Sequence, residues 1–440
     1  MKHLAAALLC LLFPALGHAA EPGRVFKTEY VAFETREESR ALDRESCERY
    51  LPFLPSEVRN IGGMSVIRGK IQVPHSWSDS DVFLHLENVG TAYDLAVNGT
   101  AVARVEDSHT PADFLISPCL NEGSNDVVIV LRNSSVPQIF EGVGPTARQS
   151  LENSYVVSRR KVGIRDFDVE LRPDSLKRFG VLDLKVLVGN SYNYEEPLTI
   201  GFDIYSPQGK LLDYSVKDVT IPGRSVDTVR FSPYIYHTYE NKWGDGRAPL
   251  YQLTLYIKVG GIPREYIPLK IGFGHSEFEN GRIVRFDQPV DIRAARYNAA
   301  ADRQTTRREI ASLKSRGYNT LCPDYPQPDF FYDLCDEIGI YVIDRAAINA
   351  PSAGDDRTPG GTPSNDPALV GEYLSRVQSM YARSHNRTCV IAYELGGPSG
   401  NGYNMYKAYQ WLKSVEKSRP VIYSGADGEW NTDNVNYTAE

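Results

Sequence analysis

The sequence predicts a multidomain protein in which two all-β sandwiches are followed by an incomplete α/β barrel of the TIM type. Short alternating strands separated by Gly, Pro and Asn turns recur up to about residue 275. Beyond that point strands alternate with amphipathic helices, which is typical of a parallel sheet. The chain of 440 residues is long enough for several domains, each with its own core. We divide it into a leader at 1–20, a first β-sandwich at 21–160, an immunoglobulin-like sandwich at 161–275 and a partial barrel at 276–440.

The first residues have the pattern of a secretory signal peptide. Lys2 precedes an apolar run at 4–16, and the small residues Gly17 and Ala19 precede the expected cleavage point. We therefore expect an exported protein, either periplasmic or secreted. No later apolar stretch is long enough to cross a bilayer, so we predict no membrane span.

Composition excludes some classes of partner. The net charge of −8 leaves no basic excess to neutralise phosphates, so we expect no nucleic-acid binding. Five cysteines remain after the leader; Cys47 could pair with Cys119, and Cys322 with Cys335, but an odd and sparse set favours separate buried thiols. No Cys or His spacing fits zinc, and we predict neither a metal nor a cofactor.

The two sandwiches are predicted from alternation and turn chemistry. In the first, a strand at 93–97 leads into Asn98-Gly99, a pair that favours a type I′ hairpin because both residues tolerate positive φ. In the second, short strands separated by Pro, Gly and Ser turns are expected at 167–171, 181–186, 198–204 and 228–231.

The barrel region shows strands and helices in turn. Helices are expected at 305–316, 329–338, 366–383 and 403–417, the second capped by Asp329 and ended by Gly339. Strands are expected at 318–321, 340–344, 389–395 and 420–423. We expect five or six barrel strands in all, not eight. In such barrels the active site lies at the carboxyl ends of the strands.

Two segments resemble glycoside hydrolase family 2. Residues 331–344, FYDLCDEIGIYVID, are similar to the family's W-Y-x-L-C-D-x-x-G-L-Y-V-x-D. Residues 383–400, RSHNRTCVIAYELGGPSG, align without gaps with its R-D-x-N-H-P-S-x-x-x-W-S-x-G-N-E-S-G. The matching positions in this second segment are Arg383, Asn386, Gly396, Ser399 and Gly400. The resemblance implies a sugar-binding jelly roll and a barrel that hydrolyses β-linked galactosides, glucuronides or mannosides.

The same resemblance locates lost chemistry. The family's Asn-Glu pair, whose Glu is the acid/base, falls on Gly397 and Pro398. A retaining glycosidase needs a second carboxylate about 5–5.5 Å from the first. We expect the segment that would carry this nucleophile to be absent, as in a truncated barrel. Asp324 replaces a family His, and Arg345 stands where the family has a Glu.

Weak substitute acids are Glu394 and Asp324, and the side chains expected to line a sugar site are Tyr325, Arg345, Tyr393 and Trp430. Three hypotheses follow. The first is a non-hydrolytic protein of carbohydrate metabolism that binds a β-linked glycan or acts as a scaffold. The second is an active retaining β-glycosidase with relocated carboxylates. The third is an interaction subunit whose half barrel is completed by a partner chain or by self-association, because an open barrel leaves bare strand edges.

Overall fold

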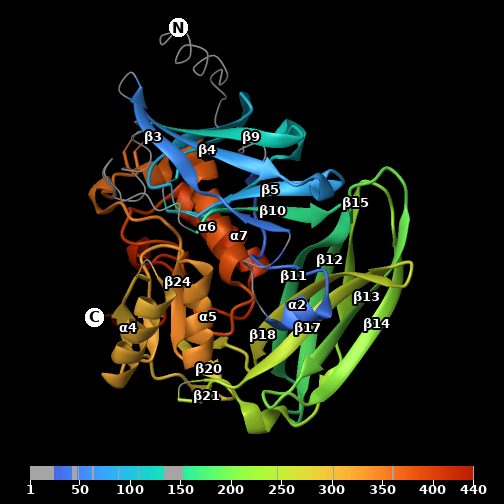
Figure 1. Ribbon diagram of the computed structural model, residues 1–440. Coiled ribbons are helices and arrows are strands. Elements are labelled where there is room, and N and C mark those ends of the chain that lie inside the picture. The colour runs from blue at the N-terminus through green and yellow to red at the C-terminus, as the bar shows by residue number, and fades with distance from the viewer. Residues whose placement is uncertain are drawn as a thin grey trace.

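The computed structural model describes residues 24–439 apart from 42–46, 48, 62–63, 88, 108, 133–150, 152, 245, 301 and 359–360. The predicted leader at 1–20 lies outside the described residues. Figure 1 shows three bodies: a blue β domain, a green β domain beside it, and an orange-to-red α/β body below the first. This arrangement confirms the predicted fold class.

The first domain packs two antiparallel sheets around one core. One sheet has the order β1-β8-β5-β10-β2 and the other β3-β4-β9-β6-β7. Leu84, Leu95, Phe114 and Ile129 fill the space between them with no exposed surface. The expected hairpin is present: Asn98 has φ 50° and Gly99 φ 78° between β6 and β7. The elements are β1 (Arg24–Val25), α2 (Arg36–Ala41), β2 (Tyr50–Pro52), β3 (Pro55–Ile61), β4 (Met64–Val73), β5 (Ser80–Leu86), β6 (Tyr93–Val97), β7 (Thr100–Val105), β8 (Ala112–Leu115), β9 (Gly123–Leu131) and β10 (Tyr155–Arg160).

The second domain is also a two-sheet sandwich. Its sheets have the orders β11-β12-β15, with β16 paired to β12, and β14-β13-β17-β18. Alternate residues of the long strands face inward, so Leu182, Leu184, Val186 and Val188 of one strand are all buried. The elements are β11 (Val162–Pro173), β12 (Gly180–Asn190), β13 (Glu196–Tyr205), β14 (Leu211–Ile221), β15 (Ser225–Phe231), β16 (Tyr234–Ile235), β17 (Leu250–Val259) and β18 (Ile262–Gly272).

The third body is a parallel sheet of five strands in the order β22-β23-β24-β25-β26. A small antiparallel sheet of β19, β20 and β21 precedes it. The elements are β19 (Glu277–Glu279), β20 (Arg282–Arg285), β21 (Gln288–Pro289), β22 (Ala294–Arg296), α4 (Arg303–Ser315), β23 (Thr320–Cys322), α5 (Asp329–Ile338), β24 (Tyr341–Arg345), α6 (Val370–Ser384), β25 (Val390–Glu394), α7 (Tyr403–Val415) and β26 (Val421–Ile422). Strands and helices alternate as predicted, and the sheet is an incomplete barrel.

Two helix starts differ from expectation. The residues before α6 form two short 3₁₀ turns, Pro363–Asn365 and Pro367–Leu369, rather than the first turns of one long helix. The Asp366 side chain accepts the Ala368 N–H and so caps the second of these short turns. The residue before α5 is Pro328, which makes no side-chain cap, so the expected cap at Asp329 is wrong. The carboxylate of Asp329 instead pairs with Arg387. Gly339 ends α5 at φ 74°, as predicted.

The two outer strands of the parallel sheet are engaged by the chain itself. Asp433 donates its N–H to the Val421 carbonyl at 2.7 Å, and its carboxylate accepts the Val421 N–H at 2.8 Å. At the other edge, Ala439 forms a parallel bridge with Ala294 of β22. Val435, Tyr437 and Ala439 also pack against the apolar core of the sheet. The strand edges that we expected to be bare are therefore partly covered by residues 432–439, which weakens the physical case for an obligate partner.

Two further expectations concern cysteines and membranes. All five described cysteines are free thiols; Cys119 is half-buried and the other four are buried. This agrees with separate thiols rather than disulfides. Among the described residues, no helix has the length and apolar character that crossing a membrane requires.

Candidate functional site

A cluster of charged side chains lies at the carboxyl ends of the barrel strands. Arg345 ends β24 and Glu394 ends β25, and Arg345 Nε donates to Glu394 Oε2 at 2.8 Å. Arg345 Nη1 lies 3.3 Å from Asp324 Oδ1, just beyond β23. Arg296, which ends β22, approaches the same Glu394 oxygen at 3.6 Å. One carboxylate is thus held by two guanidinium groups, and a second carboxylate shares one of them.

The two central side chains of this charge cluster are buried, and the third is partly exposed. The Glu394 side chain is 2% exposed and that of Arg345 4%, whereas that of Asp324 is 44% exposed. Burial alone would lower the pKa of Arg345, but the Glu394 and Asp324 charges outweigh it and raise that pKa. Burial, then the Glu394 charge, raises the pKa of the Tyr437 hydroxyl, which lies close to the cluster. Charged partners of this kind fix Glu394 in place.

No proton-transferring side chain stands at the position of the family acid/base. Gly397 and Pro398 follow β25 in the loop at the strand end, where Gly397 donates its N–H to the Ile348 carbonyl at 2.7 Å. A Cβ added to Gly397 would lie 2.5 Å from Asn349 Oδ1, so the Asn349 amide fills this space. Pro398 is exposed. Neither residue offers a group that gives or takes a proton.

The predicted aromatic residues do not form one sugar site. Tyr325 follows Asp324 and stacks on His109 of the first domain, with ring centroids 4.3 Å apart. Burial lowers the pKa of His109 to about 4, so this ring is neutral at physiological pH. The Tyr325–His109 pair therefore brings an uncharged aromatic surface from two domains beside the charged cluster.

Tyr393 and Trp430 lie elsewhere. Tyr393 has no exposed surface and packs against Tyr381, at 5.5 Å between centroids, and beneath Arg419. It precedes Glu394 on β25, and neighbouring residues of a strand face opposite sides of the sheet. Our prediction that Tyr393 lines the site is therefore wrong. Trp430 is 54% exposed and stacks on Tyr406 of α7, at 5.1 Å.

Sequence reasoning missed several members of the cluster. Asn298 donates to Asp324 at 2.9 Å, and Arg296 reaches Glu394 from a strand of only three residues. The signal of that strand was too short to predict it. The proximity of Tyr437 and His109 depends on tertiary packing, for which the sequence carries no local signal.

The family-matched Arg383 lies at a different place, the joint between the barrel and the first domain. Its guanidinium donates to Glu87 at 2.8 Å and lies 3.2 Å from Glu29. It also donates to the Gln327 carbonyl at 2.6 Å. The side chains of Arg383, Glu87 and Glu29 are each at most 8% exposed. Arg383 therefore connects two domains through a buried ion-pair network.

His85 extends this network. Its Nε2 lies 2.9 Å from Glu87 and its Nδ1 3.3 Å from Asp113. Burial alone would lower the pKa of His85, but Asp113 and Glu29 outweigh it and raise that pKa to about 9. Glu29, His85 and Glu87 are close enough together to hold a metal ion. The Arg383 guanidinium already approaches both carboxylates, so the trio fits an internal cation better than a metal.

Asn386, the second matched residue, joins the barrel to the second domain. Its Oδ1 accepts the Val169 N–H at 2.8 Å, and its Nδ2 donates to the Phe167 carbonyl at 2.9 Å. The same Nδ2 donates to Thr28 Oγ1 at 3.0 Å. All of these partners lie outside the barrel, so the role of Asn386 is to fix the domains relative to one another.

Two sandwiches placed against an incomplete α/β barrel define the architectural class of this multidomain protein. The family model described as "Glycosyl hydrolases family 2, sugar binding domain" matches residues 45–142. The model described as "Glycosyl hydrolases family 2, TIM barrel domain" matches residues 293–439. The chain belongs to glycosyl hydrolase family 2.

Relatives and solved structures agree with this family. The chain is 29% identical over 352 residues to a β-galactosidase of Vibrio cholerae, covering 77% of this chain and 34% of the relative. A β-galactosidase of Pectobacterium atrosepticum is 26% identical, and the match covers 80% of this chain and 35% of the relative. Thus the chain spans about a third of the length of these curated relatives. A family 2 member from Bacteroides cellulosilyticus shares the fold with a TM-score of 0.69 at 15% identity, with 92% of this chain and 56% of that chain covered. A Bacteroides uniformis β-glucuronidase shares the fold with a TM-score of 0.68 at 15% identity, and the match covers 82% of this chain and 46% of that chain.

Proposed function

We propose that this chain is an exported family 2 protein that binds a β-linked glycan without hydrolysing it. The observation that carries the proposal is the replacement of the family acid/base by Pro398, together with the capture of the nearest carboxylate, Glu394, by Arg345. Export is proposed from the leader pattern at 1–20.

Hydrolysis with retention needs two carboxylates on opposite sides of the sugar, one of them able to supply a proton. Glu394 and Asp324 instead approach the same Arg345 guanidinium. An arginine between two carboxylates stabilises the charged form of both. This geometry favours the non-hydrolytic hypothesis over relocated catalytic carboxylates.

Glycan binding is supported by the family description of residues 45–142 as a sugar-binding domain. The matched relatives are β-galactosidases, and one fold neighbour is a β-glucuronidase, so β-linked galactosides and glucuronides are the first ligands to try. Isothermal titration calorimetry against β-linked oligosaccharides tests binding. No heat of binding across galactosides, glucosides, mannosides and glucuronides would contradict it.

Hydrolysis is tested with 4-nitrophenyl β-glycosides, whose good leaving group needs little acid assistance but still requires a nucleophile. We expect release of nitrophenol by the purified protein to equal that of a buffer blank. Glu394→Gln and Asp324→Asn are the matched controls. Turnover that disappears in either variant would establish relocated catalysis and overturn the proposal.

The partner-chain hypothesis is less favoured because residues 432–439 engage both β22 and β26. Light scattering at micromolar concentration should therefore give the mass of a monomer. A stable dimer would instead favour self-association through the barrel.

A further inference from the structure

A large cleft lies at the end of the barrel sheet opposite the Arg345 cluster. Its volume is about 1380 Å³, and its walls come from the second domain, from the segment that connects it to the barrel, from the start of β25 and from the residues that precede β26. Val390, which begins β25, lines the cleft, whereas Glu394 ends the same strand. Four residue steps along a strand span about 13 Å. The cleft and the strand-end cluster are therefore separate places.

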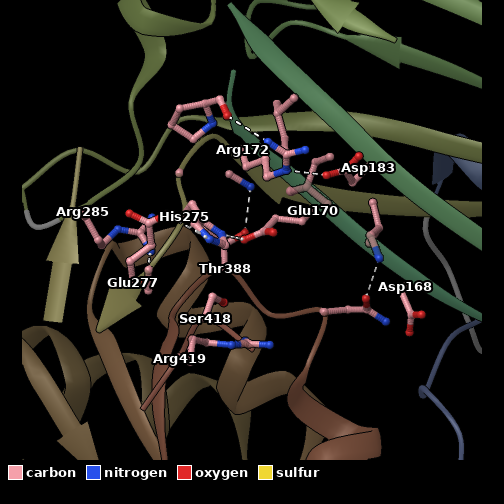
Figure 2. A pocket seen from close by; sticks show the side chains of 18 of the residues that line it. Asp168, Glu170, Arg172, Asp183, His275, Glu277, Arg285, Thr388, Ser418 and Arg419 are labelled. Atoms are coloured by element: carbon pink, nitrogen blue, oxygen red, sulfur yellow. Dashed lines mark hydrogen bonds and ion pairs between the residues drawn. The ribbon is translucent and has the colours of Figure 1, made fainter. Parts of the chain in front are cut away.

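Figure 2 shows side chains converging on this cleft from three sides. Glu170 comes from the second domain, His275 and Glu277 from the connection between domains, and Arg419 from the barrel. The walls are fixed to one another, because Asp168 accepts from His385 at 3.0 Å and Thr388 Oγ1 accepts the Gly272 N–H at 2.8 Å. A cleft with fixed walls loses little conformational entropy when a ligand enters.

Charged side chains of both signs meet around His275 in the cleft. His275 lies between Glu170, at 2.5 Å, and Glu277, at 3.7 Å. Burial alone would lower the pKa of His275, but these carboxylates raise it. Arg285 adds a second cation, and no carboxylate of the described residues forms an ion pair with it. Over the whole cleft, eight Asp or Glu side chains and nine Lys or Arg side chains line the walls together with two histidines, so charges of both signs are present in nearly equal number.

These groups retain unused hydrogen-bonding capacity. Arg285 is 6% exposed; its Nη1 donates to Ser276 at 2.7 Å, and its Nε has no hydrogen-bond partner in the described structure. Burial lowers the pKa of this guanidinium. The side chains of Glu170 and Glu277 are 42% and 53% exposed, so their carboxylates remain open to a ligand. The cleft therefore offers donors and acceptors side by side.

The mixture of positive and negative side chains in the cleft indicates which class of ligand it can bind. An anion would meet Glu170 and Glu277, and a cation would meet Arg285. A sugar hydroxyl both donates and accepts, so neighbouring hydroxyls can bind a carboxylate and a guanidinium together. Phe278 of β19 also lines the cleft and is half-buried, which gives an apolar surface for the C–H face of a sugar ring.

We propose that this cleft, rather than the strand-end cluster, binds an uncharged portion of a β-linked glycan. The inference rests on the proposed glycan binding and deepens it by placing the ligand at the joint between the second domain and the barrel. Glu277 would accept sugar hydroxyls, and Phe278 would pack against the ring.

The test is calorimetric titration of the full chain with neutral β-linked tetrasaccharides of galactose, glucose and mannose. For any ligand that binds wild type, Glu277→Ala and Phe278→Ala should each raise Kd about tenfold. Both side chains lie at least partly exposed, and an unchanged thermal unfolding midpoint would show that the fold persists. Glu195→Ala and Tyr194→Ala, at exposed positions of the second domain outside the cleft, are the matched controls and should leave Kd unchanged.

Failure of this inference is distinguishable from failure of the proposed function. If wild type binds a tetrasaccharide and Tyr325→Ala at the strand ends weakens it while both cleft variants bind normally, the cleft assignment is overturned and glycan binding stands. If acidic tetrasaccharides of glucuronate bind more tightly than neutral ones, the uncharged class is wrong. If wild type binds none of these glycans, both proposals are overturned.

Discussion

The strand-end cluster and the domain joints differ in how they relate to the family pattern. At the joints, Arg383 and Asn386 match the pattern and bond to other domains. At the strand ends, Gly397, Pro398 and Arg345 depart from it, and the acidic side chains present are neutralised by arginine. The residues that match the family pattern contact other domains, and the departures fall at the positions to which the resemblance assigns catalysis.

Other matched residues support this distinction. Ser399 accepts the Ala350 N–H at 2.9 Å and donates to the Gly397 carbonyl at 3.0 Å. Gly400 has φ 68°, and a Cβ there would lie 2.2 Å from the Gly354 carbonyl oxygen. Both shape the loop after β25. A motif can therefore identify a fold and its domain packing even where the residue at its catalytic position differs from the family's.

The largest effect is expected from a substitution that breaks the joint between the barrel and the first domain. Arg383→Met would leave Glu29 and Glu87 buried without their guanidinium partner. Removal of one member of a buried ion pair costs about 3–5 kcal/mol. Urea unfolding followed by tryptophan fluorescence should show this loss of unfolding free energy.

The control for this variant is Arg303→Met. Arg303 also contacts two carboxylates, Asp333 and Glu337, but its side chain is 43% exposed. Exposed pairs contribute less than about 1 kcal/mol. Equal losses in the two variants would contradict a special role for the Arg383 joint.

His85, in the same buried network as Arg383, should make the stability of the protein depend on pH. Its folded pKa of about 9 exceeds the usual value of 6.5, so folding favours the protonated form. This contribution is fully present below pH 6.5 and is lost as pH rises through about 9. It amounts to about 3 kcal/mol, since one pKa unit corresponds to about 1.4 kcal/mol.

His85→Gln isolates this effect, because glutamine cannot be protonated. The difference in unfolding free energy between wild type and the variant should shrink as pH rises from 6.5 to 9. A difference that stays constant over that range would show that His85 does not remain charged in the folded protein.

Much of the fold could be predicted from sequence because its signals are local. The Asn98-Gly99 turn, the Gly339 helix end and the alternation of Leu182, Leu184 and Val186 each depend on neighbours in the chain. The site could be predicted only in part. Glu394, Asp324 and Arg345 were each assigned to the site through the family resemblance, and the structure brings the three side chains together.

The rest depends on contacts between distant segments. Arg296 ends a strand too short to have a pattern, and His109 reaches Tyr325 only when the first domain docks on the barrel. Tyr393 was assigned to the site from its type alone, although strand alternation with Glu394 places it on the opposite face. Stricter use of that periodicity would have excluded it.

A moderate effect is expected at the second joint. Asn386→Ala removes the acceptor of the Val169 N–H and the donor to the Phe167 carbonyl. Leaving such backbone groups unpaired costs about 1–3 kcal/mol. The urea midpoint should fall accordingly, and Asn193→Ala, at an exposed position of the second domain, should leave it unchanged. An unchanged midpoint in Asn386→Ala would remove this residue from the set that assembles the domains.

The smallest effect is expected where the family chemistry is written back into the strand-end loop. The double variant Gly397→Asn with Pro398→Glu restores the family pair, yet hydrolysis of 4-nitrophenyl β-glycosides should stay at the level of the blank. The restored Glu would supply a proton, but the other carboxylates, Glu394 and Asp324, still approach Arg345 and cannot act as a free nucleophile. Gly397→Asn with Pro398→Gln is the matched control. Turnover by the Glu variant and not by the Gln variant would reveal a nucleophile at the strand ends. The difference between the domain joints and the strand ends would then depend on the residue at position 398 alone.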